Sequence, residues 1–340
     1  MERILYSNAD FCAVTEERRL VEYIPAAACD EAGRILWGKV QRIMPALDAA
    51  FVDIGRKKAG FLPLKENSSS FQGSTLRSGD RVLVQIRKEE TGEKGVYLTR
   101  DLSIPGSSLI FMPMNRHLGV SARITEVSER TRLQETGMRL SGGSFGLVMR
   151  EAALRATETE LKAELEKLQK QWNQVLEGET ARGSIEEELL RDYTPRGITS
   201  VIRNQPLSAD LSRQLSEAKN RMIHLPHGGN IVIDACEALT VVDVNSASDA
   251  AGGNREETAL ETNLDACQEI MIQTRLRNIS GILILDMIDM NSEAYRLRVL
   301  QALGSAFRED RVKTVIHGFT SLGLIEMTRK RTRPALAEMC

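Results

Sequence analysis

Two stretches decide the fold, Leu239-Thr240-Val241-Val242-Asp243 and Ile282-Leu283-Ile284-Leu285-Asp286. Each is a short apolar run typical of a buried β-strand, and each ends in an aspartate. A helical pattern over residues 256–277 separates them, and the order strand, helix, strand predicts a right-handed crossover in a largely parallel sheet. Since α/β sheets place their sites at the carboxyl ends of parallel strands, we expect the two carboxylates to converge there.

Two converging carboxylates repel each other unless a cation lies between them. Because no His or Cys stands nearby, oxygen-only ligation by Asp243 and Asp286 favours Mg²⁺, or Mn²⁺ as a substitute, over Zn²⁺. Such an ion suits phosphoryl chemistry, since it polarises a phosphate and lowers the pKa of an attacking water. Asn245 lies two residues past Asp243, on the same side of an extended chain, and its amide could bind a ligand oxygen.

A different interpretation of the two aspartates stays open at this point. They could cap helices or form salt bridges, as strand-end acids often do. Asp289 is a further candidate, but three residues past Asp286 it is expected rather to start the next helix. The pattern alone does not decide between a metal site and these structural roles.

The composition is that of an ordinary globular protein. The net charge of the chain indicates a partner only when it is counted segment by segment. The 340 residues carry 45 Lys and Arg against 47 Asp and Glu, a net charge of −2 that by itself argues against a polyanionic partner. Residues 34–101, however, hold 13 basic and 8 acidic residues (net +5), and residues 311–333 hold 6 and 1 (net +5). Residues 151–192 hold 6 and 11 (net −5), so two basic segments are offset by one acidic segment.

Several classes of protein are disfavoured by the same count. No apolar run reaches the roughly 18 residues of a membrane span, and the first 30 residues lack a signal-peptide core, which predicts a cytoplasmic protein. The five cysteines include no CxxC pair, so we expect neither a disulfide framework nor a zinc finger. The four scattered histidines make a His-rich metal site a poor expectation.

Residues 33–101 read as closely spaced short strands, which predicts a small β-barrel. Phe51 and Phe61 stand out there, because aromatic residues are only 4% of the chain. Interleaved with basic residues that include Lys94, exposed rings would stack bases while cations hold phosphates. Two core phenylalanines would give the same pattern.

After the barrel, an apolar stripe between residues 154 and 178 predicts a charged amphipathic helix that packs one face on a neighbour, or else binds a partner as a coiled coil.

Taken together, these segments resemble the ribonuclease E/G family of bacterial endoribonucleases. The resemblance is carried by an ordered series of segments that covers most of the chain and is weakest from about 151 to 222. The segments are Ala49-Ala50-Phe51-Val52-Asp53, Gly60-Phe61-Leu62-Pro63-Leu64-Lys65-Glu66, Lys94-Gly95, the run from Leu225 to Asp234, the run from Glu237 to Ser246, Glu256-Glu257-Thr258, Thr262-Asn263-Leu264, the run from Gly281 to Met290, and the run from Gly323 to Arg331.

The resemblance implies roles for particular residues. Asp243 and Asp286 would bind the catalytic Mg²⁺, and Asn245 would position the scissile phosphate. Phe51, Phe61 and Lys94 would clamp RNA on an S1-type barrel. A sensor of RNA 5′-monophosphate would use three further positions, namely Gly106, Ile110 and Arg150. The threonine that follows this arginine in the family is Glu151 here, whose charge would repel a phosphate, which argues against 5′-end sensing.

The resemblance also implies a fold, an α/β multi-domain chain with a DNase I-like catalytic subdomain, a shortened RNase H-like subdomain and an inserted OB-fold (S1-type) β-barrel. We expect the RNase H-like part at 1–33 and 181–221, shortened because 204–222 is too short for the whole of it. The barrel is expected at 34–102, a 5′-sensor-like region with the charged helix at 103–180, and the catalytic subdomain at 222–340. The chain stops at Cys340 without the family's zinc-binding Cys-Pro-x-Cys link, so neither structural zinc nor a zinc-linked dimer is expected.

The sequence therefore predicts a cytoplasmic, Mg²⁺-dependent endoribonuclease that hydrolyses single-stranded RNA to 5′-phosphate and 3′-hydroxyl ends, in RNA processing or mRNA decay. A non-catalytic RNA-binding protein of the same family is the main alternative, and a DNA-directed nuclease is a weaker one. Salt-sensitive binding without cleavage would favour the former.

Overall fold

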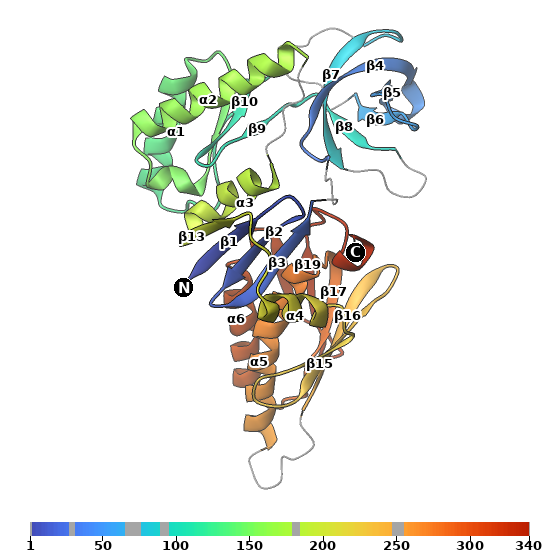
Figure 1. Ribbon diagram of the computed structural model, residues 1–340, viewed down its shortest axis with the longest axis vertical. Coiled ribbons are helices and arrows are strands. Elements are labelled where there is room, and N and C mark those ends of the chain that lie inside the picture. The colour runs from blue at the N-terminus through green and yellow to red at the C-terminus, as the bar shows by residue number, and fades with distance from the viewer. Residues whose placement is uncertain are drawn as a thin grey trace. The chain divides into compact units, whose positions relative to one another are not determined.

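The computed structural model describes residues 2–26, 31–64, 76–88, 95–178, 184–246 and 255–339. The chain divides into two compact units, the first formed by Met1–Cys29 with Arg196–Cys340 and the second by Asp30–Pro195. Figure 1 shows the elements of each unit. Within the described residues, no helix combines the length and apolar character that crossing a membrane requires.

The first unit contains two sheets. A four-stranded sheet has the order β13-β1-β2-β3, and a six-stranded sheet has the order β14-β15-β16-β17-β19-β18. The strands are β1 (Arg3–Ser7), β2 (Phe11–Glu16), β3 (Arg19–Pro25), β13 (Ser200–Arg203), β14 (Met222–His224), β15 (Asn230–Ala235), β16 (Leu239–Asn245), β17 (Gly281–Asp286), β18 (Thr314–Phe319) and β19 (Ile325–Arg329). The helices are α4 (Ala209–Glu217), α5 (Arg255–Leu276), α6 (Glu293–Phe307) and α7 (Leu336–Met339).

One face of the six-stranded sheet is buried under α5 and α6 (Figure 1). Along β16, the residues at even positions are buried, among them Val242 and Val244, whereas Asp243 on the other face is exposed. The same alternation places Leu283 and Leu285 of β17 in the core, with Asp286 exposed. The alternation that defines a half-buried strand therefore puts both aspartates on the face opposite the helices.

The crossover from β16 through α5 to β17 is parallel, as predicted. The prediction of a largely parallel sheet is wrong, because β14–β15, β15–β16, β17–β19 and β18–β19 are antiparallel pairs. The physical reason is connection length. Only residues 236–238 separate β15 from β16, which allows a hairpin but not the longer crossover that a parallel pair needs.

The second unit contains a closed barrel with the strand order β4-β5-β6-β8-β7, which confirms the barrel predicted from the sequence. Its strands are β4 (Ile35–Met44), β5 (Ala49–Asp53), β6 (Gly60–Pro63), β7 (Arg81–Lys88) and β8 (Tyr97–Thr99), with the 3₁₀ helix η1 (Pro45–Leu47) between β4 and β5. Aliphatic side chains, including Val52, Leu62 and Val84, fill its interior.

After the barrel comes a four-stranded sheet of order β11-β12-β10-β9, packed against helices. The elements are β9 (Ile104–Pro105), β10 (Leu109–Met112), β11 (Leu118–Val120), α1 (Val127–Ser141), β12 (Gly146–Met149), η3 (Glu151–Leu154), α2 (Glu158–Leu176), α3 (Ile185–Tyr193) and η4 (Thr194–Arg196). The predicted charged helix is α2, which begins at a capping box between Thr157 and Glu160. Its stripe, including Leu161, Leu165 and Leu168, is buried against this sheet, so the packed-helix interpretation is the one the structure supports.

Candidate active site and RNA-binding face

Asp243 and Asp286 are direct partners in the register of the parallel pair β16–β17. Both are exposed, and both stand on the sheet face that α5 and α6 leave open. The structure thus brings together the two carboxylates that the sequence singled out. Side chains of in-register residues on adjacent strands lie side by side, so the two negative charges are close neighbours.

The helix-cap and salt-bridge alternatives do not describe these aspartates. Among the described residues, neither carboxylate takes part in an ion pair, and Asp243 accepts a hydrogen bond from Asn245 Nδ2 at 2.9 Å. A nearby cation, Arg221, is bound to Asp234 through two contacts of 2.5 and 2.7 Å. That hydrogen bond, with a smaller contribution from Asp243, raises the pKa of the Arg221 guanidinium. Within the described part of the chain, Arg221 is thus paired with Asp234, and neither Asp243 nor Asp286 has an ion-pair partner.

The donor set fits a hard divalent cation. Two exposed carboxylates offer oxygen ligands, which is what Mg²⁺ binds, usually through one or two carboxylates with several waters retained. The described residues hold no cluster of three or more His, Cys, Asp or Glu that could hold a metal by themselves. An ion at Asp243 and Asp286 would thus depend on water or substrate oxygens for its remaining ligands, as Mg²⁺ does and structural Zn²⁺ does not.

Asn245 lies on the same face as Asp243, and its Nδ2 also approaches Oδ1 of Asn230 at 3.4 Å. Asn230 is its direct partner in the antiparallel pair β15–β16. The Asn245 amide therefore contacts both the Asp243 carboxylate and the Asn230 side chain. These contacts place amide donors and acceptors beside the aspartate pair. Asn230 belongs to the segment that carried the family resemblance, but its position opposite Asn245 depends on the hairpin register and was not predicted.

Asp289 does not start a helix, contrary to the expectation. Helix α6 begins at Glu293, and Ser292 is its N-cap, with a hydroxyl that accepts a hydrogen bond from the Tyr295 amide. The loop that carries Asp289 is instead held by Asn263, which is fully buried in α5. The Asn263 side chain donates to Ile288 O and accepts from Ile288 N, each at 2.9 Å. A buried amide on an apolar helix face is the signal that could have identified it.

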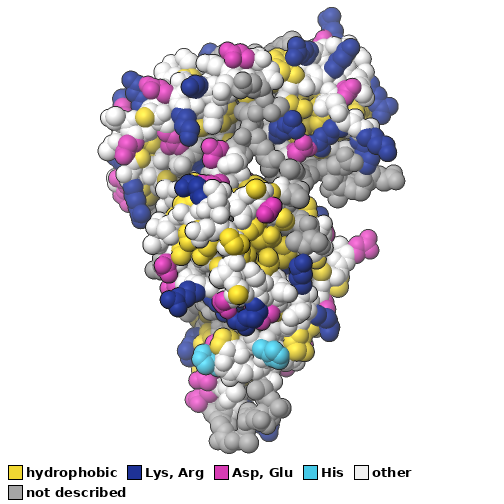
Figure 2. Space-filling model, in the orientation of Figure 1, with side chains coloured by type: hydrophobic (Ala, Val, Ile, Leu, Met, Phe, Trp, Pro, Cys, Tyr) yellow, Lys and Arg dark blue, Asp and Glu magenta, His cyan; other side chains and the backbone are white. Residues whose placement is uncertain are grey.

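On the barrel, Phe51 and Phe61 are partners in the antiparallel pair β5–β6 and are half-buried. Their ring centroids lie 6.0 Å apart in an edge-to-face arrangement. Neither ring belongs to the barrel core, so the alternative of two core phenylalanines is not what the structure shows. Figure 2 shows Lys and Arg side chains gathered over the barrel. Lys94 lies outside the described residues.

The sequence missed a third ring on this face. Tyr97 in β8 pairs with Phe61 in β6, and their centroids lie 5.7 Å apart. Two cations flank the rings, with the Arg42 guanidinium 4.7 Å from the centroid of Phe51 and Lys88 Nζ 5.6 Å from that of Tyr97. Partly exposed aromatic rings with cations against them are features of a surface that stacks nucleic-acid bases and holds phosphates.

The candidate 5′-sensor residues meet carboxylates of their own unit. Arg150 donates to Asp192 at 2.9 Å and to the carbonyl of Gly106 at 2.6 Å. The Ser108 amide, in the loop between Gly106 and Ile110, donates to the carboxylate of Glu164 at 3.1 Å. These are the kinds of donor that would bind a phosphate, and here carboxylates and a carbonyl occupy them.

Ile110 and Glu151 occupy the other positions of the sensor-like region. Ile110 lies in β10 and pairs with Val148 and Pro105. Glu151 begins η3 and faces Arg123 at 3.8 Å, with each side chain about half exposed. The acid that follows Arg150 in the sequence therefore faces Arg123.

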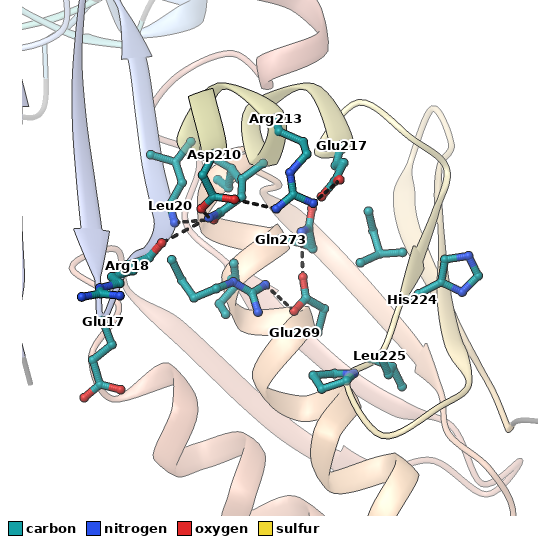
Figure 3. Close-up of a pocket in the computed structure, with 16 residues that line it drawn as sticks. Glu17, Arg18, Leu20, Asp210, Arg213, Glu217, His224, Leu225, Glu269 and Gln273 are labelled. Atoms are coloured by element: carbon teal, nitrogen blue, oxygen red, sulfur yellow. Dashed lines mark hydrogen bonds and ion pairs between the residues drawn. The ribbon is translucent and has the colours of Figure 1, made fainter. Parts of the chain in front are cut away.

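A cavity of about 430 Å³ lies in the first unit, between the β2–β3 hairpin, α4, α5 and the segment around β14 (Figure 3). Its charged side chains are largely paired with one another. Arg213 lies between Asp210 at 2.5 Å and Glu217 at 3.3 Å, and Arg19 contacts Glu269 at 2.7 Å. The two candidate catalytic carboxylates do not line this cavity. The cavity is therefore separate from the aspartate pair.

Comparison with known proteins shows the family to which this chain belongs. The sequence profile of the Ribonuclease E/G family matches residues 103–209 and 198–332, and that of the S1 RNA binding domain matches residues 30–101. Ribonuclease G of Escherichia coli (strain K12) is 36% identical over an alignment that covers 89% of this chain and 73% of that protein. Ribonuclease G of Haemophilus influenzae is 33% identical with the same coverage. Ribonuclease E of Escherichia coli (strain K12) is 35% identical over 88% of this chain and 34% of its own length. The chain belongs to the ribonuclease E/G family and carries an S1-type barrel.

Proposed function

We propose that this protein is a Mg²⁺-dependent endoribonuclease that hydrolyses single-stranded RNA to 5′-phosphate and 3′-hydroxyl ends. One observation carries the proposal, the in-register placement of Asp243 and Asp286 on the open face of the sheet in a member of a ribonuclease family, with no ion pair to either carboxylate among the described residues. Two adjacent carboxylates with no cation of their own are stabilised by a divalent ion, and a divalent ion is what phosphodiester hydrolysis at neutral pH uses.

The residues at the site have distinct roles in this proposal. Asp243 and Asp286 would hold Mg²⁺, which when bound neutralises phosphate charge and lowers the pKa of a coordinated water. Asn245 would donate an amide hydrogen to a non-bridging phosphate oxygen in place of Asp243, its present acceptor at 2.9 Å. The oxygen of water would form a bond to phosphorus while the bond from phosphorus to O3′ breaks, and O3′ would take up a proton to replace the one that water loses. That direction of cleavage leaves a 5′-phosphate and a 3′-hydroxyl.

RNA would be held by the barrel, through base stacking on Phe51 and Phe61 and phosphate contacts with basic residues that include Lys94. The family resemblance favours a DNase I-like identity for residues 222–340 and a shortened RNase H-like identity for 1–33 with 181–221. A region at 103–180 would correspond to the 5′ sensor. A role in RNA processing or mRNA decay in the cytoplasm fits this activity.

The test is cleavage of a 5′-labelled single-stranded RNA with Mg²⁺, with Mn²⁺ and with a chelator. We expect cleavage with either metal, none with the chelator, and near-complete loss in Asp243→Asn and in Asp286→Asn. Glu261→Gln is the matched control, because Glu261 is an exposed acid on α5, which covers the opposite face of the sheet. Ligation of the products would identify their 5′-phosphate and 3′-hydroxyl ends.

Three outcomes would contradict the proposal. Salt-sensitive RNA binding without cleavage at any Mg²⁺ or Mn²⁺ concentration would favour the RNA-binding alternative. Faster cleavage of a matched DNA oligomer than of RNA would favour a DNA-directed nuclease. Unimpaired cleavage by both Asn variants would show that the chemistry lies elsewhere.

A further inference from the structure

Tyr97 completes a row of three rings on the barrel. Phe51, Phe61 and Tyr97 occupy one line of cross-strand neighbours over β5, β6 and β8. Successive ring centroids lie 6.0 and 5.7 Å apart, and all three side chains are half-buried. Side chains paired in this way project from the same face of a sheet. The row therefore presents three partly exposed rings to a ligand that lies across the strands.

The row ends in a cation on each side. Arg42 is the cross-strand partner of Phe51, and Lys88 is the partner of Tyr97. Both cations are exposed and lie within 6 Å of the ring centroids that they flank, Arg42 at 4.7 Å and Lys88 at 5.6 Å. A polyanion that crosses the row thus meets a positive charge at each end and aromatic surface between them, the combination that holds single-stranded nucleic acid.

We propose that Tyr97 is a third base-stacking residue for RNA, which extends the site by one nucleotide beyond Phe61 toward Lys88. The proposal rests on the proposed function only in taking the barrel to bind single-stranded RNA. Stacking tolerates any base, because every base has a π-face, so Tyr97 lengthens the site without adding sequence preference. Lys88 contributes a phosphate contact at the same end.

The test is binding of 5′-labelled oligouridines of increasing length to the full chain, by fluorescence anisotropy in a chelator that prevents cleavage. Tyr97→Ala should weaken binding about 5- to 150-fold, the range for removal of one stacked base. It should also make affinity stop increasing at an oligomer one nucleotide shorter than for the unchanged protein. Tyr97→Phe keeps the ring and should bind as the unchanged protein does.

A second pair of variants separates stacking from folding and from charge. Tyr97→Leu keeps apolar volume without a π-face and should fold normally, by thermal unfolding, yet bind as weakly as Tyr97→Ala. Tyr97→Ala should leave unchanged the slope of log affinity against log salt concentration, whereas Lys88→Ala should lower it by about 0.7 for a single strand.

The proposal is overturned if Tyr97→Leu binds like the unchanged protein, or if Tyr97→Phe binds as weakly as Tyr97→Ala. Its failure is distinguishable from failure of the proposed function. Normal RNA cleavage with unaltered binding in Tyr97→Leu would reject the third stacking position alone. Length-dependent binding that Tyr97→Leu shortens, with no cleavage in Mg²⁺, would reject the nuclease function alone.

Discussion

Replacing Asp286 by Asn should have opposite effects on stability in the absence and presence of Mg²⁺. Without metal, the variant loses a repulsion between two carboxylates that face each other on adjacent strands. Adjacent strands are about 4.8 Å apart, and two unit charges about 5 Å apart in water repel by roughly 0.8 kcal/mol. Because Asp243 and Asp286 are both exposed, the aqueous value applies. We therefore expect Asp286→Asn to unfold with a free energy about 1 kcal/mol higher than that of the unchanged protein, or about 2–4 °C higher in Tm.

With metal, the order of the two proteins should reverse. At a Mg²⁺ concentration 100 times its Kd, binding stabilises the unchanged protein by about 2.7 kcal/mol. The variant, with one carboxylate left, gains little of this. The unchanged protein should then be the more stable by roughly 2 kcal/mol. A metal-binding pair therefore predicts two stability curves that cross as Mg²⁺ is added, while RNA cleavage is lost.

Differential scanning calorimetry across a Mg²⁺ titration that starts in chelator measures both effects. Glu261→Gln serves again as the control and should match the unchanged protein at every concentration. The reasoning is refuted if Asp286→Asn is less stable in chelator, as loss of a structural aspartate would make it, or if the variant keeps the full Mg²⁺-dependent rise in Tm.

Two further predictions concern groups outside the aspartate pair. Glu16→Gln should lower the free energy of unfolding by about 3–5 kcal/mol at pH 7, because it leaves two buried guanidinium groups, Arg3 and Arg275, without their shared carboxylate. Burial alone would raise the pKa of Glu16, but Arg275 and Arg3 lower it on balance from 4.5, so this stabilisation is complete above about pH 4.5 and is lost as the pH falls through the lower folded value. Urea titrations at pH 7 and pH 3 measure this loss of unfolding free energy. An equal loss in Glu16→Gln at the two pH values would contradict the reasoning. Since Arg150 is already bound by Asp192, RNAs with 5′-monophosphate and 5′-hydroxyl ends should be cut at equal rates, and a 5′-monophosphate preference that Arg150→Ala abolishes would be the contrary result.

The aspartate pair could be predicted from the sequence because local alternation determines which face each strand residue occupies. In β16 and β17 the buried positions alternate with open ones, and the crossover through α5 makes the two strands parallel. Asp243 and Asp286 end their apolar runs on the same face for this reason. Phe51 and Phe61 could also be predicted from local sequence, because aromatic residues are rare in this chain and both stand in short predicted strands.

Tyr97 could not be predicted because its place in the row depends on pairing between distant strands. β8 pairs with β6 in parallel, and its register with β7 shifts between Ile86 and Lys88. No local spacing encodes either feature. The N-terminal hairpin was missed for a related reason, since all six residues of β2 are buried and the strand shows no alternation. The ion pair between Glu16 and Arg275 joins residues 259 positions apart.

The parallel pairing of β1 with β13 has a consequence for the order in which the chain folds during synthesis. Ile4 pairs with Ser200, and the Arg3 amide donates to the Thr199 hydroxyl, 196 residues later. At about 5–20 residues per second, a ribosome takes roughly 10–40 s to cover that distance. Through this interval the edge of β1 that β13 will cover has no strand beside it, while the whole of the second unit is made. The second unit can therefore be complete before the first can begin to close, and the nascent β1 edge is exposed to other chains for that time.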